Sequence, residues 1–241
     1  MKSSLFLSMA AIASMTAIAA PAQAISFNLS SGVAGPNGEV NQGSYSEFSQ
    51  QEGFVTVDFN NGVAPSEGFA SYSFVASGRS GSDSRVTTNK WAPDGSNNEV
   101  NQSKYLQVFS GQDVVIEFAE TLNYFGINWG SESPGNTFSF FRGDELIGSF
   151  GIEDVDFKQV GSRSNQGTGY LDFRAESSND IFDKIVISQY GGGGFETDNH
   201  TFRSGTGGFD AADVPEPGIV AGLLAFGGLV VAKRRRSESV A

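Results

Sequence analysis

Val114-Val115-Ile116-Glu117-Phe118 and, shortly after it, Tyr124-Phe125-Gly126-Ile127-Asn128-Trp129 form the stretch that decides the fold. Both runs are short and rich in β-branched and aromatic residues, which is typical of β-strands. Runs of the same kind are Phe54-Val55-Thr56-Val57-Asp58-Phe59, Thr137-Phe138-Ser139-Phe140-Phe141 and Lys184-Ile185-Val186-Ile187-Ser188. No helical apolar period persists between them. The pattern predicts an all-β fold, an antiparallel β-sandwich of jelly-roll-like type.

One β-hairpin can be predicted from the spacing of its strands. Arg142-Gly143-Asp144-Glu145 separates two apolar runs, residues 138–141 and 146–150. A short polar connection that contains glycine is typical of a hairpin turn. We therefore expect these two runs to pair antiparallel. No internal repeat is apparent.

The first residues are typical of an export signal. Lys2 supplies a positive charge, residues 5–20 are apolar, and Ala22-Gln23-Ala24 is a small-x-small cleavage pattern. We expect residues 1–24 to be a signal peptide that is removed, so that the mature chain begins at Ile25. An uncleaved anchor is the alternative.

The last residues combine three features in a fixed order. Val214-Pro215-Glu216-Pro217 is followed by an apolar segment, residues 218–232, and then by Lys233-Arg234-Arg235-Arg236. As a helix, about 15 residues would reach roughly 22 Å, less than the ~30 Å hydrocarbon core of a bilayer. Spanning would therefore require snorkelling of the basic side chains or local thinning of the membrane. The basic cluster is expected on the cytoplasmic side, with the body of the protein outside.

This terminal pattern resembles the PEP-CTERM sorting signal of Gram-negative bacteria, in particular its cyanobacterial versions. The resemblance covers residues 213–241. It implies recognition by an exosortase, a membrane enzyme expected to process the tail near Pro215-Glu216-Pro217. It also implies passage through the inner membrane to the cell surface or extracellular matrix, often beside exopolysaccharide. An unprocessed C-terminal membrane anchor is the alternative.

Between these ends, residues 25–212 are expected to form one β-sandwich domain. The chain carries a net charge of −12, and this domain is more acidic still because Lys2 and the terminal cations lie outside it. An acidic surface repels nucleic acid, so we expect no nucleic-acid partner. The absence of cysteine excludes disulfides, thiol catalysis and thiolate metal sites. Stability must therefore come from a core rich in phenylalanine.

More loosely, the domain resembles the β-sandwich bodies found with such tails, in the runs at residues 104–108, 122–131, 136–141 and 195–199. A structural role is expected for each conspicuous residue in them. Gly126 permits close approach of a neighbour or a bulge, and the side-chain amide of Asn136 closes the turn at residues 131–136. Asp198 and Asn199 satisfy backbone donors at the start of the last strand. The resemblance brings no catalytic residue with it.

Enzymatic activity is not expected. His200 is the only histidine, no Gly-x-Ser-x-Gly elbow is present, and zinc lacks ligands of the required type. A pair of carboxylates, as in a glycoside hydrolase, remains open because acidic residues are plentiful. The densest group is Glu153, Asp154 and Asp156, which we interpret as a solvated turn.

Two long polar loops, residues 78–103 and 161–169, are either ligand-facing or simply solvated. Asp94-Gly95-Ser96-Asn97-Asn98-Glu99 in the first offers oxygen atoms suited to calcium but lacks the EF-hand spacing. No cofactor and no metal ligand is assigned, although a structural calcium remains possible. If the domain binds carbohydrate, Trp91 is the expected exposed platform on which a sugar ring stacks. Trp129 ends an apolar strand and is expected in the core.

We therefore expect an exported, exosortase-sorted surface or matrix protein with a non-catalytic β-sandwich. The alternative is a carbohydrate-binding module associated with exopolysaccharide, and a secreted glycoside hydrolase ranks third. A binding module predicts an exposed aromatic group beside polar side chains, whereas a hydrolase predicts a cleft with two carboxylates.

Overall fold

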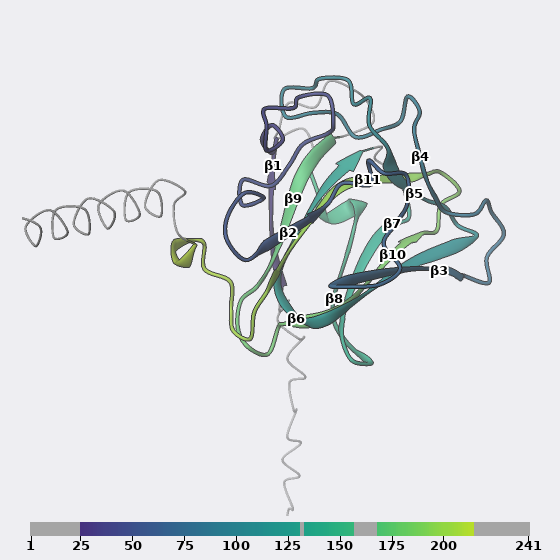
Figure 1. Ribbon diagram of the computed structural model, residues 1–241. Helices are drawn as coiled ribbons and strands as arrows, with labels where there is room; N and C mark the ends of the chain where they lie inside the picture. Colours follow the sequence, from purple (N-terminus) through teal and green to yellow (C-terminus); the bar gives the residue numbers. More distant parts are fainter. Residues whose placement is uncertain (1–24, 131–132, 157–167, 215–241) are drawn as a thin grey trace, which may run out of the picture.

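The computed structural model describes residues 25–130, 133–156 and 168–214 of the 241-residue chain. Figure 1 shows these residues as an all-β domain. The strands are β1 (Ile25–Ser30), β2 (Phe54–Val57), β3 (Ala70–Ala76), β4 (Arg85–Thr87), β5 (Tyr105–Val108), β6 (Gln112–Gly130), β7 (Asn136–Arg142), β8 (Glu145–Gly151), β9 (Thr168–Ala175), β10 (Phe182–Gln189) and β11 (Phe195–Ser204). Within the described residues, the helical elements are the short 3-10 turns η1 (Ile152–Asp154) and η3 (Ala211–Asp213). The predicted all-β, antiparallel fold is confirmed.

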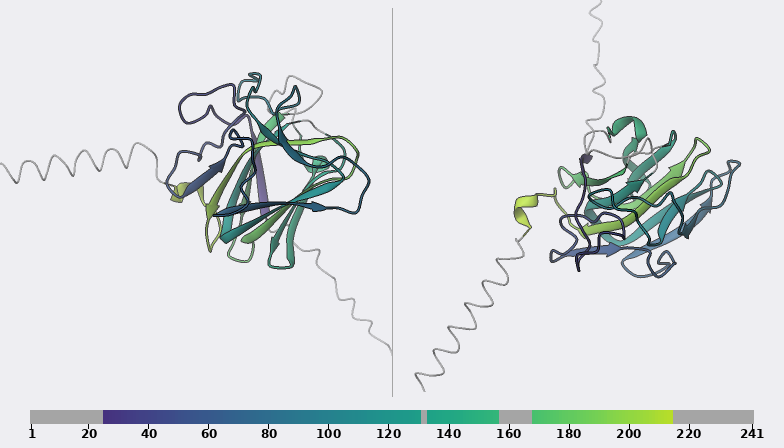
Figure 2. Two further views of the ribbon diagram at one scale, coloured as in Figure 1. Left: turned by 45° about the vertical axis from the view of Figure 1, so that its right-hand side comes forward. Right: turned by 90° about the horizontal axis from the view of Figure 1, so that it is seen from above.

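Strand β6 organises the sheet because its two halves pair with different neighbours. The first half of β6, up to Phe118, pairs with β3 and β10. β7 and β8 continue the sheet beyond β10, and these strands make up the first half of the sheet. The second half pairs with β9 and β11, which carry β1 on one side and β2, β5 and β4 on the other. The β10 pairing shifts register between these halves, opposite the interval from Glu117 to Leu122. The sheet curls there, so that its two halves face each other (Figure 2).

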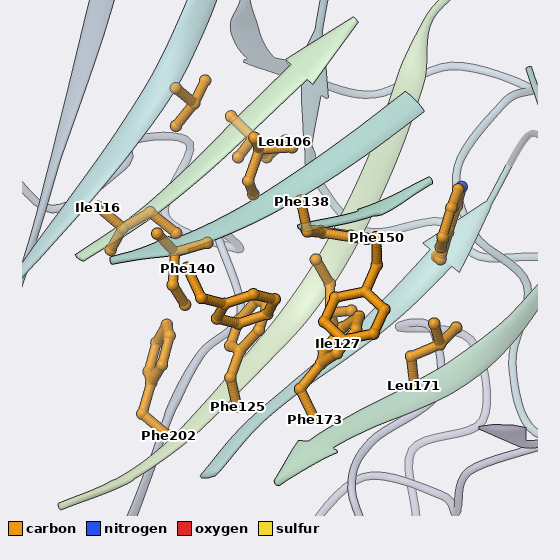
Figure 3. Close-up of a cluster of buried hydrophobic side chains, with 14 of the residues drawn as sticks. Leu106, Ile116, Phe125, Ile127, Phe138, Phe140, Phe150, Leu171, Phe173 and Phe202 are labelled. Carbon is orange, nitrogen blue, oxygen red and sulfur yellow. The ribbon is translucent and has the colours of Figure 1, made fainter. Parts of the chain in front are cut away.

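The core lies between the two halves and is mainly aromatic (Figure 3). Phe125 of β6 packs with its ring centroid 6.2 Å from that of Phe138 on β7, and 5.9 Å from that of Phe173 on β9. Phe138 and Phe173 lie 5.3 Å apart. These three side chains are fully buried. Because rings from both halves interlock in this way, burial of apolar surface holds the curled sheet together.

Two strand predictions are wrong in detail. Residues 114–118 and 124–129 are parts of one 19-residue strand, not two strands. The residues between them remain extended because β6 passes from one half of the sheet to the other. The run that begins at Phe54 ends as a strand at Val57. Phe59 has a positive φ of 55° and its carbonyl accepts a hydrogen bond from Gly62 N–H at 2.8 Å, so the chain turns there.

The other predicted elements are confirmed. β7 and β8 form the expected hairpin, with Phe138 opposite Phe150 and Gly143 at a positive φ in the turn. β10 contains the predicted run at residues 184–188. Gly126 is closely approached, because a Cβ atom there would lie 2.7 Å from the Tyr170 hydroxyl oxygen.

The second half of the sheet has a polar outer side that is nevertheless buried. Alternate residues of a strand face opposite sides, so Phe195 and Thr197 of β11 point to the core side and Glu196 and Asp198 point outward. Glu196 and Asp198 are 2% and 0% exposed. Loop residues cover this outer side, as shown by the hydrogen bonds from Asn199 Nδ2 to Ser44 O and from Asn101 Nδ2 to Asp198 Oδ2. The candidate site lies at its edge, where the cover is incomplete.

Candidate functional site

The floor of the candidate site is made by three neighbouring strands of the second half. Arg85 of β4 lies opposite Gln107 of β5, and Gln107 lies opposite Glu196 of β11. Gln107 donates from Nε2 to Glu196 Oε1 at 2.7 Å, and Arg85 donates from Nη2 to Gln107 Oε1 at 3.4 Å. The register of the sheet therefore places a guanidinium, an amide and a carboxylate in one connected row.

Aromatic side chains form the walls. Trp91 is 37% exposed, and Lys90 Nζ lies 4.7 Å from the centroid of its ring. The Trp91 backbone is held by Asn89, whose Oδ1 accepts from Trp91 N–H at 2.8 Å and from the Tyr105 hydroxyl at 2.7 Å. Phe109 lies under Arg85, with 5.1 Å from its ring centroid to the guanidinium carbon. A cation therefore lies over each ring, and Trp91 keeps about a third of its surface open to solvent.

A run of glycines closes the far side of the groove. Gly192, Gly193 and Gly194 line it together with Ser133. A Cβ at Gly194 would lie 2.1 Å from Glu196 Oε1, and one at Gly193 would lie 2.7 Å from Ser133 Oγ. Larger residues would therefore displace the floor of the groove. The resulting groove has a volume of about 580 Å³.

The groove can bind a polar ligand that also has an apolar face. Trp91 offers a ring for stacking, while the row of Arg85, Gln107 and Glu196 offers both donors and acceptors. Glu196 is the one carboxylate among the described residues that line the groove. Hydrolysis by two carboxylates would require a second, placed at a defined separation.

The predicted environments of the two tryptophans are confirmed, while a sugar contact at Trp91 stays a prediction. Trp91 lies in a loop and is exposed as expected for a platform, and Trp129 is fully buried in the core. The structure joins Trp91 to strand residues that sequence inspection did not select. Gln107 and Glu196 are missed because nothing in the sequence distinguishes polar residues that line a groove from polar residues covered by a loop.

His200 is buried among aromatic rings and lies outside the groove. Its Nδ1 is 2.9 Å from the Tyr72 hydroxyl oxygen, and its Nε2 is 3.0 Å from Thr197 Oγ1. The ring centroid of Phe59 lies 4.9 Å from that of His200. Burial lowers the pKa of His200 to about 3, so the ring is neutral at ordinary pH.

Asp198 and Asn199 lie in the middle of β11, so the prediction that they begin the last strand is wrong. β11 starts three residues earlier, at Phe195. For Asp198 the predicted backbone role is present, because its Oδ1 accepts from Asn199 N–H at 2.9 Å. For Asn199 it is wrong, because its side chain donates to the backbone carbonyls of Gln42 and Ser44. Asn199 has a positive φ of 47° at an irregularity in the pairing with β6. Burial raises the pKa of Asp198 well above its usual value.

The other acidic candidates do not converge on a site. Glu153 and Asp154 are exposed within η1 and Asp156 is exposed just after it, in agreement with a solvated turn. In the loop at residues 94–99, Glu99 accepts from Asn97 N–H and from Asn97 Nδ2, at 2.9 and 3.1 Å. Nowhere in residues 25–130, 133–156 and 168–214 do three or more His, Asp or Glu side chains gather as metal ligands.

Asn136 closes the described part of its turn through its backbone. Its N–H donates to Ser133 O at 3.2 Å, while its side-chain oxygen accepts from Gln189 Nε2 at 2.6 Å. Of the loop at residues 161–169, only the last two residues are described, and they belong to β9.

The ends of the chain are described only at their inner boundaries. Ile25 is buried and pairs with Ala175 at the start of β1. Val214 is 9% exposed and packs beside Phe48 and Tyr124. The other predicted residues of the signal cleavage site, the sorting motif and the basic cluster lie outside the described part, namely Ala22, Ala24, Pro215, Glu216, Pro217, Lys233, Arg234, Arg235 and Arg236. No helix within the described ranges is long and apolar enough to cross a membrane.

The sequence contains one motif twice. The pattern Gly-x-Asn-x-Glu-Val-Asn-Gln-x-x-Tyr occurs at residues 35–45 and again at residues 95–105. The expectation that the chain has no internal repeat is therefore wrong. The signal is short, and it becomes visible only when the chain is compared with itself at a fixed offset.

Comparisons of this chain with protein families, with curated proteins and with solved structures find no match.

Proposed function

We propose that this protein is exported and sorted to the cell surface or matrix, and that its β domain binds carbohydrate in the groove at Trp91. The observation that carries the binding proposal is the exposed Trp91 ring beside the hydrogen-bonded row of Arg85, Gln107 and Glu196. A sugar ring has an apolar face that stacks on an aromatic ring and hydroxyl groups that pair with such side chains. The groove offers partners for both.

The polar row is arranged before any ligand arrives. Glu196 is 2% exposed and its Oε1 is already held by Gln107. The Gly193–Gly194 backbone lies close to Ser133 and Glu196, with no room for a Cβ at either glycine. Binding to such a preorganised site loses little side-chain entropy. Each hydrogen bond that a ligand hydroxyl makes there contributes on the order of 1 kcal/mol.

We propose binding without hydrolysis. Glu196 is buried in the floor and accepts a hydrogen bond from Gln107, so its part is to hold the Gln107 amide in place. Among the described lining residues there is no second carboxylate across the groove from it. The sorting proposal rests on the terminal sequence pattern, with exosortase and the inner membrane as transient partners and extracellular polysaccharide as the ligand.

The finer architecture is part of the same proposal. We propose that the curled sheet is a β-sandwich whose halves are joined by β6. Rings from the two halves interlock across the core, as Phe138 of β7 does with Phe173 of β9, and this supports the sandwich. The jelly-roll-like strand connection stays a prediction.

Replacing Trp91 tests the binding proposal. Wild type and Trp91→Ala would be compared by isothermal titration against exopolysaccharide from the producing cells and against an array of oligosaccharides. We expect Trp91→Ala to weaken binding at least about tenfold, because loss of a stacked ring costs one to several kcal/mol. Phe74→Ala is the matched control, since Phe74 is also 37% exposed but lies on β3, outside the groove. Equal binding by wild type and Trp91→Ala would refute the proposal.

A further inference from the structure

The two copies of the repeated motif adopt the same local structure. In the first copy, Gly35 N–H donates to Glu39 O at 2.7 Å, and Asn37 N–H donates to Glu39 Oε2 at 2.8 Å. In the second copy, Gly95 N–H donates to Glu99 O at 2.8 Å, and Asn97 N–H donates to Glu99 Oε2 at 2.9 Å. We call the segments 35–45 and 95–105 the twin loops. The sequence repeat is therefore a structural repeat.

The twin loops lie side by side and are joined directly. Gln102 N–H of the second loop donates to Asn41 O of the first at 2.8 Å. Gly95 packs so closely on the first loop that a Cβ there would lie 2.5 Å from Val40 O. Asn199 of β11 holds the first loop through Gln42 O at 2.7 Å and Ser44 O at 3.0 Å. The pair is thus fixed to the sheet as one unit.

A polar cavity of about 410 Å³ lies where the twin loops meet. Its lining consists entirely of neutral amide and hydroxyl side chains, from Asn41, Gln42, Asn60, Gln102 and Ser103. Side-chain amides carry a donor and an acceptor next to each other, which matches neighbouring hydroxyl groups of a sugar. The cavity therefore suits a neutral polyhydroxylated ligand.

The charges around the cavity do not favour an ionic ligand of one sign. The buried carboxylate of Asp198 lies behind Ser103, with 3.3 Å between Ser103 Oγ and Asp198 Oδ2. Asp58 is held beside Asn60, whose N–H donates to Asp58 Oδ1 at 3.1 Å. Lys104 follows Ser103 and reaches towards Gly62. Charges of both signs are present, while the groups that line the cavity are uncharged.

The cavity and the Trp91 groove lie along the same strand. Ser103 lines the cavity and lies two residues before β5 begins. Gln107 lines the groove and belongs to β5. Four residues of extended chain span at most about 14 Å. Tyr105, between them, donates from its hydroxyl to Asn89 of the groove. A glycan of several sugar residues covers such a distance, whereas a single sugar does not.

We infer that the cavity between the twin loops is a second carbohydrate subsite, so that the domain reads an oligosaccharide and not a single sugar. This inference rests on the proposed function of the Trp91 groove. Sugar residues that extend beyond the groove bind the amides of Asn41 and Gln102. These two side chains are exposed, and so they can be changed without disturbing the fold.

The test measures affinity against ligand length. The exopolysaccharide of the producing cells is partly hydrolysed with acid and separated by size into fractions from single sugars to long oligosaccharides. Each fraction is titrated into the purified chain, into the double variant Asn41→Ala/Gln102→Ala and into Trp91→Ala. Gln50→Ala is the matched control, because it removes an exposed amide outside the cavity.

We expect wild type to bind long fragments at least about tenfold more tightly than single sugars, because two or more added hydrogen bonds at about 1 kcal/mol each give such a factor. The double variant should bind long fragments only as tightly as short ones, and Trp91→Ala should weaken both. If Trp91-dependent binding shows no dependence on length, or if the double variant matches wild type, the second subsite is wrong while the groove stands. If no fraction binds wild type, the proposed function itself fails.

Discussion

Gly126 shows how a single residue is fixed by its surroundings. A Cβ there would lie 2.6 Å from the Tyr124 hydroxyl oxygen and 2.7 Å from both Cε1 and the hydroxyl oxygen of Tyr170. Both tyrosines are fully buried, and the Tyr170 hydroxyl donates to Asn199 O at 2.9 Å. The side chains of Tyr124 and Tyr170 can therefore occupy these positions only because Gly126 has no side chain.

We expect Gly126→Ala to lower the free energy of unfolding by about 1–3 kcal/mol, because the added methyl group overpacks a closed site. Urea unfolding followed by fluorescence would measure the change. Gly207→Ala is the control, since a Cβ at Gly207 meets no atom within 4 Å. A Gly126→Ala protein as stable as the control would contradict this account of the packing.

Asp172 makes stability depend on pH. Its side chain is 2% exposed and accepts a hydrogen bond from the Tyr124 hydroxyl. Burial raises the pKa of Asp172 to about 6, whereas an unfolded chain has a value near ~3.9. The folded state therefore binds more protons than the unfolded state between these two values. The contribution of Asp172 to the free energy of unfolding is fully present below pH ~4, and it falls as pH rises through about 6.

We expect Asp172→Asn to remove this part of the pH dependence. The difference in unfolding free energy between wild type and Asp172→Asn should shift by on the order of 3 kcal/mol between pH ~4 and ~7. Urea unfolding at a series of pH values would measure it. The lowered pKa of His200 acts with the opposite sign and makes the protein less stable as pH falls. Because both proteins contain His200, this effect cancels in the difference between their unfolding free energies. Parallel curves would show that Asp172 is not the group responsible.

At the scale of elements, the segment that follows β11 stays attached to the domain. Phe209 N–H donates to Ala175 O at 2.8 Å, and its ring lies 5.0 Å from that of Tyr124. The guanidinium carbons of Arg174 and Arg203 lie 5.3 and 5.4 Å from the centroid of this ring. Val214, the first residue of the predicted sorting motif, is buried in the same cluster. The chain therefore reaches the motif in contact with the domain.

We expect Phe209→Ala to detach this segment and to lower the free energy of unfolding by about 2 kcal/mol, because the ring and its cation–π contacts are lost together. Limited proteolysis followed by mass spectrometry should then show new cleavage between residues 205 and 214. Phe209→Leu keeps an apolar side chain and serves as the control. Identical cleavage patterns for wild type and Phe209→Ala would show that Phe209 does not hold the segment.

At the scale of the whole molecule, the sorting proposal predicts where the protein goes and what happens to its C-terminal peptide. We expect the natural protein to lose its terminal peptide at the cell surface. A variant in which Pro215, Glu216 and Pro217 are alanine should keep that peptide and remain in the inner membrane. Cell fractionation with mass spectrometry of the C-terminus would measure both. An intact terminal peptide in the inner membrane for both proteins would instead identify a plain membrane anchor.

The sequence alone determined the class of fold and about half of its strands, because alternation of apolar and polar residues is a local property. The β7–β8 hairpin, β10, and the opposite environments of Trp91 and Trp129 could all be predicted in this way. Only the tertiary structure decided that residues 112–130 are one strand, since its continuity depends on partners from both halves of the sheet. It alone joined Trp91 to Gln107 and Glu196, and one twin loop to the other. These groupings arise from sheet register and from contacts between segments far apart in the chain, and no local pattern encodes them.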